Sequence, residues 1–368
     1  MADIRELCYN NTSVNTYIVC SIDTADRLSR YIFKKGGYYM SENTTSQAGK
    51  ISISAKRNGN PTPFGIHGRL HVDGMYLTDE HGEKTRLKGV STHNLSSYPE
   101  YINLKTMTYL ADEWGISIFR LAMYAGRADE KDGYADGSDG HRQDLEEMVL
   151  TAVRDAASLG IYVMLDWHVL LECDPNIHTD AAISFFKKMC PLLKAYDNVI
   201  YEICNEPNGE AVTWPLICNY ANKVIPVIRA IVPESVIIVG TPCWSQEVDK
   251  PAADPLPYGN LMYTLHFYAD THRDSLRNLA LGALEKGLPI YVTECGFCNA
   301  AGDGDINKEE TAAWMELMAK YNISWIGWNL SNKDEASAFI KPDCDKLYDW
   351  TDDELREHGL LMKEYLIK

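Results

Sequence analysis

The sequence predicts an α/β protein whose main part is a (β/α)8 barrel, the TIM-barrel architecture, preceded by a short β-rich N-terminal extension. Three observations lead to this prediction. From Arg86 onward, short apolar runs alternate with helical patterns, as in chains of βαβ units. Eight such runs occur, and eight βα units close into a barrel more readily than they form an open sheet. The chain also carries no G-x-G-x-x-G or P-loop motif of the kind found in nucleotide-binding open sheets.

Each predicted strand is an apolar run bounded by polar or turn residues. The eight runs are 87–91, 116–123, 162–167, 199–204, 236–240, 262–268, 290–294 and 324–330. Helical patterns follow at 104–114, 142–159, 181–196, 214–231, 273–286, 308–320 and 353–367. We expect an irregular connection after the fifth strand, where Pro251, Pro255 and Pro257 break any long helix. Pro191 and Pro226 lie inside helical patterns, so we expect those helices to be kinked or interrupted.

The first part of the chain differs in composition from the barrel region. It is rich in Asn, Thr and Ser around short β-like runs at 17–20, 38–40 and 51–53. It ends in Asn58-Gly59-Asn60-Pro61-Thr62-Pro63, turn residues that cannot continue regular structure. We therefore predict an extension or small β module at 1–62 and a main domain at 63–368. Two hairpins, turning at Asp73-Gly74 and His81-Gly82, are expected to lead into the main domain.

Composition excludes several classes of function. The 35 basic and 52 acidic residues give a net charge of -17 without any basic run, so we expect no nucleic-acid partner. No apolar stretch reaches the length of about 18 residues that a membrane helix needs, so we expect no membrane partner. The N-terminus lacks the pattern of a secretory signal. Of the ten cysteines, Cys295 and Cys298 have metal-pair spacing, but no second pair follows, and we favour a packing or site-lining role.

Polar side chains concentrate at the ends of the predicted strands. In chain order they are His93, Arg120 with Tyr124, Asp166 with His168, Asn205 with Glu206, Trp244, His266 with Tyr268, Glu294, and Trp328 with Asn329. The strand starts carry no comparable set. Taken singly, each residue could serve structure by pairing or packing. Burying so many charged groups together is costly unless they line a polar cavity, so we predict a site at this rim.

Two of these residues, Glu206 and Glu294, indicate the chemistry. Paired carboxylates suit cleavage of glycosidic bonds, because one acid protonates the leaving oxygen while the other attacks or activates water. Surrounding aromatic faces can hold sugar rings, and no cofactor is needed. A metal hydrolase is the main alternative, since Asp166, His168 and His266 are ligand types. No H-E-x-x-H or closely spaced His/Asp cluster is present, so we expect no metal.

Several motifs, in order, resemble those of family 5 glycoside hydrolases, in particular bacterial endo-β-1,4-glucanases (cellulases). They are Asp166-Trp167-His168, Asn205-Glu206-Pro207, His266-Phe267-Tyr268, Thr293-Glu294 and Trp325-Ile326-Gly327-Trp328-Asn329-Leu330-Ser331. The resemblance runs from about His67 to the C-terminus and does not cover residues 1–62. It implies a retaining enzyme that acts on cellulose or related β-glucans.

The resemblance also implies a role for each matching residue. Glu206 would be the general acid/base and Glu294 the nucleophile. Arg120 and Tyr268 would hydrogen-bond the nucleophile, and Asn205 would contact the 2-hydroxyl of the sugar at the cleavage point. The remaining implied substrate-site residues are His93, Tyr124, His168, His266 beside Glu206, the stacking platforms Trp244 and Trp328, and the more distant Lys333 and Glu335.

Two positions depart from the family pattern. Ser97 stands where related cellulases often carry an aromatic platform, although the neighbouring Tyr98 could compensate. Cys295 follows the nucleophile where Trp is common. Both changes affect the expected affinity and chain-length preference, but neither removes a catalytic group.

Alternatives to a cellulase remain open from the sequence. An endo-mannanase or mixed-linkage glucanase would share every catalytic residue, and a carbohydrate-binding protein without turnover is a third possibility. We expect a monomer that binds a polysaccharide or oligosaccharide. Because the substrate is a polymer, we expect an exported, extracellular enzyme despite the missing signal pattern.

Overall fold

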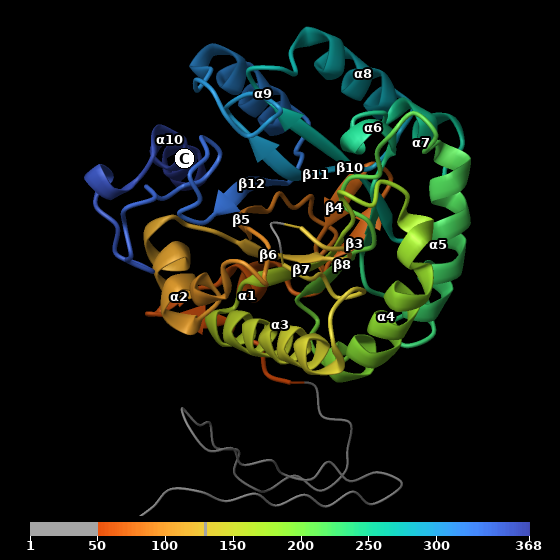
Figure 1. Cartoon of the computed structure of the whole chain (residues 1–368), viewed down its shortest axis with the longest axis horizontal. Helices are drawn as coiled ribbons and strands as arrows, with labels where there is room; N and C mark the ends of the chain where they lie inside the picture. The colour runs from red at the N-terminus through yellow and green to blue at the C-terminus, as the bar shows by residue number, and fades with distance from the viewer. Residues whose placement is uncertain (1–50, 129–130) are drawn as a thin grey trace, which may run out of the picture. The chain divides into compact units, whose positions relative to one another are not determined.

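A computed structural model describes residues 51–128 and 131–368, and the chain from Ser52 to Lys368 forms one compact unit. Eight parallel strands in this unit close into a barrel surrounded by helices (Figure 1). Neighbours along the chain pair in order from β5 to β12, and β12 pairs back with β5 through Trp325↔Lys88. The predicted (β/α)8 barrel is confirmed.

The bounds of the elements are close to those expected from the sequence. The barrel strands are β5 (Lys88–Thr92), β6 (Ile118–Tyr124), β7 (Tyr162–His168), β8 (Val199–Glu202), β9 (Ile237–Val239), β10 (Leu261–Tyr268), β11 (Ile290–Gly296) and β12 (Trp325–Leu330). The main helices are α2 (Leu104–Glu113), α3 (Asp139–Leu159), α4 (Thr179–Leu193), α5 (Trp214–Arg229), α8 (Asp274–Glu285), α9 (Lys308–Lys320) and α10 (Glu357–Ile367). Only the short helices α6 (Pro242–Ser245) and α7 (Asp249–Ala253) follow β9 before β10 begins, as the prolines predict.

Alternation along the strands divides the core into two layers. On β7, Tyr162 and Met164 belong to the apolar cluster inside the barrel, whereas Val163 and Leu165 belong to the larger cluster beneath the helices. Because side chains alternate with a period of two, the next inward position after Met164 is Asp166. Apolar residues therefore fill the lower barrel and leave polar residues at its carboxyl end.

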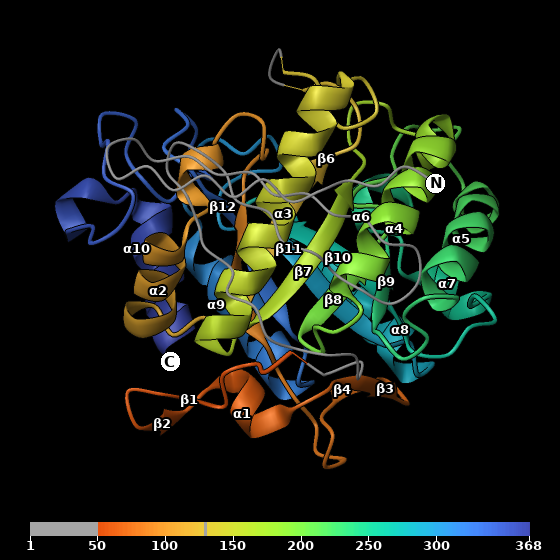
Figure 2. The same cartoon turned by 90° about the horizontal axis from the view of Figure 1, so that it is seen from below.

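The segment before β5 covers the amino ends of the barrel strands (Figure 2). It contains the two-residue strands β1 (Lys56–Arg57) and β2 (Asn60–Pro61), the short helix α1 (Pro63–His67), and the hairpin β3 (His71–Asp73) with β4 (Tyr76–Thr78). Leu70 and Leu77 join the inner apolar cluster, and the Tyr162 hydroxyl donates to Gly68 O at 2.6 Å. This segment closes the end of the barrel opposite the polar rim.

Predictions for the N-terminal region have mixed outcomes. The hairpin at Asp73-Gly74 is confirmed, but His81-Gly82 forms only a turn with a single bridge between Thr78 and Lys84. The run 51–53 is not a strand, and the runs 17–20 and 38–40 lie outside the described residues. Residues 52–62 belong to the same compact unit as the barrel, and Ser54 N donates to Ala157 O. The division into 1–62 and 63–368 stays a prediction.

Three helix predictions differ from the structure in part. Helices α4 and α5 continue past Pro191 and Pro226 for two or three residues, so neither helix is interrupted at its proline. The predicted helix 353–367 is instead a 3₁₀ turn at Asp352–Glu354 followed by α10. Between them Arg356 N donates to Phe339 O, which holds this stretch extended.

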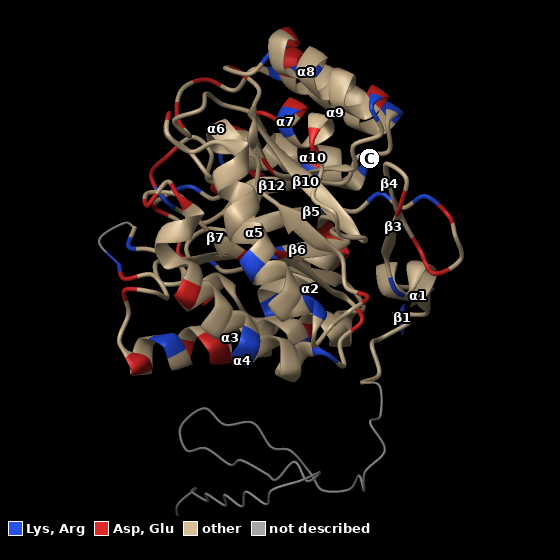
Figure 3. Ribbon diagram, turned by 90° about the vertical axis from the view of Figure 1, so that its right-hand side faces the viewer, with Lys and Arg blue, Asp and Glu red and all other residues tan. Residues whose placement is uncertain are grey.

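Charged residues are distributed over the outer helices and loops, and the barrel strands are mostly uncharged (Figure 3). Among the described residues, no helix is both long enough and apolar enough to cross a bilayer.

Candidate active site

The predicted site residues meet at the carboxyl end of the barrel. Arg120 lies midway along β6 and Asp166 near the end of β7, and both are fully buried. Asn205 and Glu206 follow β8 in the first turn of its loop, with Glu206 N donating to Val169 O at 3.0 Å. Glu294 lies near the end of β11 and pairs in register with His266 of β10. Parallel strands thus bring together residues that are distant in the sequence.

The two predicted catalytic carboxylates face each other. One oxygen of Glu206, one oxygen of Glu294 and a ring nitrogen of His266 all lie within 4.8 Å of one another. Retaining glycosidases hold their two carboxyl groups about 5 to 5.5 Å apart, whereas inverting enzymes leave about 6.5 to 9.5 Å for a water. The closest approach of these oxygens therefore fits the retaining geometry.

Glu294 is held by two donors, one on each oxygen. The Tyr268 hydroxyl donates to Oε1 at 2.8 Å, and Arg120 Nη1 donates to Oε2 at 3.4 Å. Arg120 Nη2 also donates to Asn205 Oδ1 at 2.6 Å, which orients the Asn205 amide. The lack of a side chain at Gly296 makes room for the Tyr268 ring, since a Cβ there would lie 2.4 Å from Cδ1 of that ring. These contacts favour the ionised form of Glu294.

Glu206 has a different environment. Its Oε1 contacts Nδ1 of His266 at 2.8 Å, and burial lowers the pKa of that imidazole to about 4, so His266 is neutral at neutral pH. No arginine or lysine contact to Glu206 occurs among the described residues, whereas Glu294 has Arg120. The two carboxylates therefore differ in the groups that stabilise their charge.

The pKa values follow from these environments. Burial raises the pKa of Glu206 to about 8, and the negative charges of Asp166 and Glu202 act in the same direction. Burial and the neighbouring Glu206 raise the pKa of Glu294 to about 7, while Arg120 and Tyr268 oppose the increase. Glu294 has direct contacts to Arg120 and Tyr268 that favour its ionised form, and Glu206 has neither, so the contacts favour a proton on Glu206 and a charge on Glu294. This arrangement is the one that an acid and a nucleophile require.

Aromatic and imidazole rings form one wall of the site. His168 stacks on Tyr124 with ring centroids 4.1 Å apart and on Trp328 at 5.3 Å. His93 lies 5.1 Å from the Trp328 ring and edge-on to Tyr98 at 5.1 Å. These five rings therefore lie together on one side of the two carboxylates.

The loop after β12 contributes Lys333 and Glu335 to the same wall. Lys333 Nζ lies 3.0 Å from Glu335 Oε2 and 3.3 Å from His93 Nε2. Asn329 Nδ2 donates to Glu335 Oε1 at 2.8 Å. The predicted distant sugar contacts are thus anchored beside His93.

Trp244 stands apart from this wall, on α6 beside the loop that carries Glu206. Its backbone N donates to Pro207 O at 3.1 Å, and its side chain is 45% exposed. Cys243, Trp244 and Ser245 all have positive φ, between 55° and 57°, which is uncommon for residues with a Cβ. The Ser245 hydroxyl donates to Asn205 O at 2.6 Å, so this strained turn supports the Asn205 backbone.

Glu202 and Thr293 are functional candidates to which the sequence alone assigned no role. Glu202 is fully buried at the end of β8 and receives Arg120 Nε at 2.8 Å and the Thr293 hydroxyl at 2.6 Å. A carboxylate inside the apolar run 199–203 was an available signal. Asp166, which the sequence did indicate, receives Arg120 Nη2 at 2.9 Å and His168 Nδ1 at 2.6 Å.

The cysteines near the site are free thiols. Cys295 and Cys298 are both buried, and Cys295 Sγ donates to Ile326 O at 3.4 Å. Their burial agrees with the packing or site-lining role expected from the sequence, and it raises the thiol pKa of both.

Glu206, His266 and Glu294 form the one group of potential metal ligands that lie this close together in the described part of the chain. Two of their ligand atoms, His266 Nδ1 and Glu206 Oε1, are already hydrogen-bonded to each other. We therefore interpret the three residues as acid/base machinery.

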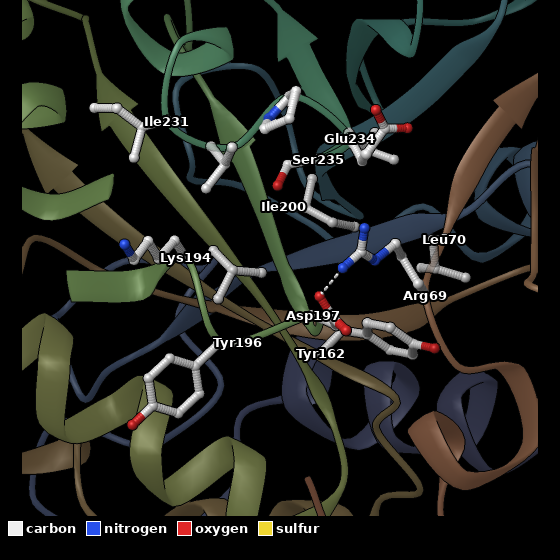
Figure 4. A pocket seen from close by; sticks show the side chains of 14 residues that line it. Arg69, Leu70, Tyr162, Lys194, Tyr196, Asp197, Ile200, Ile231, Glu234 and Ser235 are labelled. Carbon is white, nitrogen blue, oxygen red and sulfur yellow. Dashed lines mark hydrogen bonds and ion pairs between the residues drawn. The ribbon is translucent and has the colours of Figure 1, made fainter. Parts of the chain in front are cut away.

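A hollow lies at the end of the barrel opposite the candidate site, near the starts of β7 and β8 (Figure 4). Tyr162, Ile200 and Val236 line it, and an ion pair joins Arg69 to Asp197 across it. It contains none of the candidate residues named in the sequence analysis.

A (β/α)8 barrel with two facing carboxylates, one held by Arg and Tyr and one beside a neutral His, defines a retaining-type glycoside hydrolase. The family described as Cellulase (glycosyl hydrolase family 5) matches residues 78–334. The chain belongs to this family and is a glycoside hydrolase.

Similar proteins agree with this assignment. The chain is 44% identical to Endoglucanase A of Butyrivibrio fibrisolvens over 80% of its own length and 67% of that protein. It is 40% identical to Endoglucanase N of Pectobacterium atrosepticum over 88% of its length and 70% of that protein. Among solved structures, the Thermobifida fusca endoglucanase Cel5A in complex with cellotetraose is 34% identical with a TM-score of 0.78, covering 83% of this chain and 100% of that one. The chain thus spans about two thirds of the length of these curated relatives.

Proposed function

We propose that this chain is an endo-acting, retaining β-1,4-glucanase that cleaves cellulose or related β-glucans. The observation that carries the proposal is the approach of the Glu206 and Glu294 oxygens to within 4.8 Å, with Arg120 and Tyr268 bound to Glu294 and a neutral His266 bound to Glu206. Membership of the cellulase family and relatives named endoglucanase support the choice of substrate.

In the first step, Glu294 attacks the anomeric carbon of the sugar at the cleavage point. The bond to the leaving oxygen breaks as Glu206 donates its proton to that oxygen, and a glycosyl-enzyme ester forms on Glu294. Tyr268 and Arg120 keep Glu294 ionised and aligned before the attack. Asn205, oriented by Arg120, donates to the 2-hydroxyl, and this bond strengthens as positive charge develops on the ring.

In the second step, the ionised Glu206 takes a proton from water, and the resulting nucleophile attacks the anomeric carbon. The ester bond to Glu294 breaks, and the product keeps its original anomeric configuration because two inversions have occurred. Burial raises the pKa of Glu206 and so supports both of its roles. Glu206 holds a proton at neutral pH in the first step, and its carboxylate takes up a proton from water readily in the second.

The aromatic wall supplies the sugar contacts. Trp328, with His93, His168 and Tyr124, would bind the sugars on one side of the cleavage point, and Lys333 with Glu335 would hydrogen-bond a more distant glucose. The exposed Trp244 would be a stacking platform. An endo-mannanase or mixed-linkage glucanase would use the same catalytic pair and differ in these contacts.

We further propose that the enzyme is a monomer. We also propose that it acts outside the cell, because its substrate is a polymer. We propose that the enzyme has no nucleic-acid or membrane partner, and a net charge of -17 disfavours binding to nucleic acid. We also propose that it needs no metal or cofactor, because two carboxylates suffice for the reaction.

The variants Glu206→Gln and Glu294→Gln test the catalytic pair. Each removes one ionisable group without changing its shape, so both should retain the wild-type circular dichroism spectrum and thermal midpoint while losing at least about a thousandfold in kcat on cellopentaose. Azide should restore turnover on an activated aryl cellobioside only in a Glu294→Ala variant, with inverted product, or in a Glu206→Ala variant, with retained product. Near wild-type turnover by either Gln variant contradicts the assignment. Reducing-sugar release from carboxymethylcellulose, barley β-glucan and mannan distinguishes the substrate alternatives.

A further inference from the structure

A continuous chain of hydrogen bonds leads from Glu206 into the barrel and ends on a carboxylate, Glu202, that has no place in the mechanism above. Glu206 Oε1 contacts His266 Nδ1 at 2.8 Å, and His266 Nε2 contacts Thr293 Oγ1 at 2.9 Å. The Thr293 hydroxyl contacts Glu202 Oε1 at 2.6 Å. All four side chains are buried, so water does not compete for these bonds.

The proton positions along this chain are coupled, because the Thr293 hydroxyl carries one proton and the neutral imidazole of His266 carries one. If Glu202 is ionised, Thr293 must donate its proton to Glu202. Thr293 Oγ1 then accepts from Nε2–H of His266, and this leaves the lone pair on Nδ1. A lone pair on Nδ1 can bind Glu206 only if Glu206 carries the proton.

The opposite direction of donation requires a proton on Glu202. In that arrangement Thr293 donates to His266 Nε2, and Nδ1–H donates to an ionised Glu206. The ionisation state of Glu202 thus selects which form of the acid/base is hydrogen-bonded. Thr264 Oγ1 also contacts Thr293 Oγ1 and can donate to it in either arrangement.

Charged groups on several strands set the state of Glu202. Arg120 of β6 donates from Nε to Glu202 Oε2 at 2.8 Å and favours the ionised form. Burial and the charge of Asp166 on β7 act in the other direction and raise the pKa of Glu202 to about 7, so Glu202 is ionised on the alkaline side of neutrality, the range in which Glu206 would otherwise lose its proton. The hydrogen bond from Thr293 of β11 favours the charged form, whereas His266 of β10 adds no net charge because it is neutral. The guanidinium therefore supplies the positive charge that a buried carboxylate at this position needs.

We propose that Glu202 and Thr293 are positioning residues that fix the direction of hydrogen bonding to His266 and so hold the proton on Glu206. The inference rests on the proposed role of Glu206 as the acid/base. After Glu206 has given its proton to the leaving group, the lone pair of His266 Nδ1 faces its carboxylate. The lone pair repels the negative carboxylate, so Glu206 becomes a stronger base for the deprotonation of water in the second step.

A matched pair of variants at Thr293 tests the direction of hydrogen bonding without changing any charge. Thr293→Val removes the hydroxyl and keeps the shape, whereas Thr293→Ser keeps the hydroxyl. Without the hydroxyl, His266 can place its proton on Nδ1 and stabilise an ionised Glu206. We expect the alkaline limb of kcat/KM on cellopentaose to move about one pH unit toward acid in Thr293→Val and to stay in place in Thr293→Ser.

Glu202→Gln is an independent test of the other end of the chain. Gln has one acceptor oxygen, and if that oxygen binds Arg120, its amide donates to Thr293 and reverses the chain. The alkaline limb should again move toward acid. The leaving group of a dinitrophenyl cellobioside needs no proton from an acid. On this substrate, Thr293→Val and Glu202→Gln should both form the glycosyl-enzyme at the wild-type rate at alkaline pH. A residue that only supports the fold would lower the rate without moving the limb.

The outcomes separate this inference from the proposed function. An alkaline limb that coincides in Thr293→Val and Thr293→Ser overturns the inference. A shift in Glu202→Gln alone also overturns it, because loss of a nearby charge then accounts for the effect. Wild-type turnover by Glu206→Gln would instead reject Glu206 as the acid/base.

Discussion

Tyr268→Phe tests how the protein controls its nucleophile. The change deletes one hydroxyl and leaves the ring, which packs against Gly296 and closes the apolar cluster beside Trp328. The lost contact is the 2.8 Å bond from the Tyr268 hydroxyl to Glu294 Oε1. Glu294 would then keep only the 3.4 Å contact to Arg120 among its described hydrogen-bond donors.

The size of the effect follows from this single bond. A hydrogen bond to a charged group contributes about 1.5 to 3 kcal/mol, so its loss corresponds to a decrease of about 10- to 150-fold in rate. The pKa of Glu294 should rise, because a donor that stabilises the ionised form has been removed. The reaction needs the ionised form, so the acidic limb of the pH profile should move to higher pH by about one unit.

The assay is kcat and kcat/KM on cellopentaose from pH 4 to pH 10, with product configuration followed by NMR. Tyr162→Phe is the matched control, since Tyr162 is also a buried strand tyrosine but donates to Gly68 at the far end of the barrel. We expect the control to keep the wild-type acidic limb. An unchanged acidic limb in Tyr268→Phe, at any rate of turnover, would refute the argument that this hydroxyl tunes Glu294.

Two further changes probe stability and substrate range. Arg120→Met leaves Asp166, Glu202 and Glu294 without their shared cation, so the free energy of unfolding should fall by about 3 to 5 kcal/mol, against about 1 kcal/mol or less for Arg69→Met in the half-exposed pair with Asp197. The pKa values of Asp166 and Glu202 in the folded state are raised to about 7, so the folded state binds more protons than the unfolded state, and the stability from these groups falls as pH rises from about 4 to 7. In Arg120→Met this fall in stability should extend above pH 7. Urea titrations in which wild type and variant lose stability with pH at the same slope would count against this. Ser97→Trp should lower KM for cellopentaose about 2- to 10-fold with kcat unchanged, because a stacked aromatic pair contributes about 0.5 to 1.5 kcal/mol. A KM for Ser97→Trp equal to that of Ser97→Ala would contradict a sugar platform at this position.

The sequence predicted the barrel because each strand can be recognised from a local pattern of residues. Runs such as 162–167 are apolar, β-branched or aromatic and stop at polar residues, and seven helical patterns appear within a few residues of their observed bounds. Prediction was weaker where an outcome depends on the exact end of an element. Pro191 and Pro226 were expected to kink or interrupt their helices, but both helices continue past the proline. A proline removes one backbone hydrogen bond, and burial of neighbours such as Cys190 and Ile225 can outweigh that loss, which the sequence does not show.

The same distinction applies to the site. Residues placed at strand ends were found, because the carboxyl ends of parallel strands meet at one rim. Glu202 was missed because it lies within a strand, and its partners Arg120 and Thr293 are 82 and 91 residues away in the chain. A carboxylate in an apolar run signals a buried charge but not the group that compensates it.

By itself the sequence predicted the fold and the family and indicated Glu206 and Glu294 as the candidate catalytic pair, because hydrophobic periodicity and strand-end motifs are local properties of the chain. Only the tertiary structure decided how the surroundings of the two carboxylates differ. That difference depends on burial and on the groups that barrel closure brings within hydrogen-bonding distance: Arg120 and Tyr268 at Glu294, and a neutral His266 at Glu206. Electrostatic energies fall off with distance through space, and distance along the chain carries little information about them.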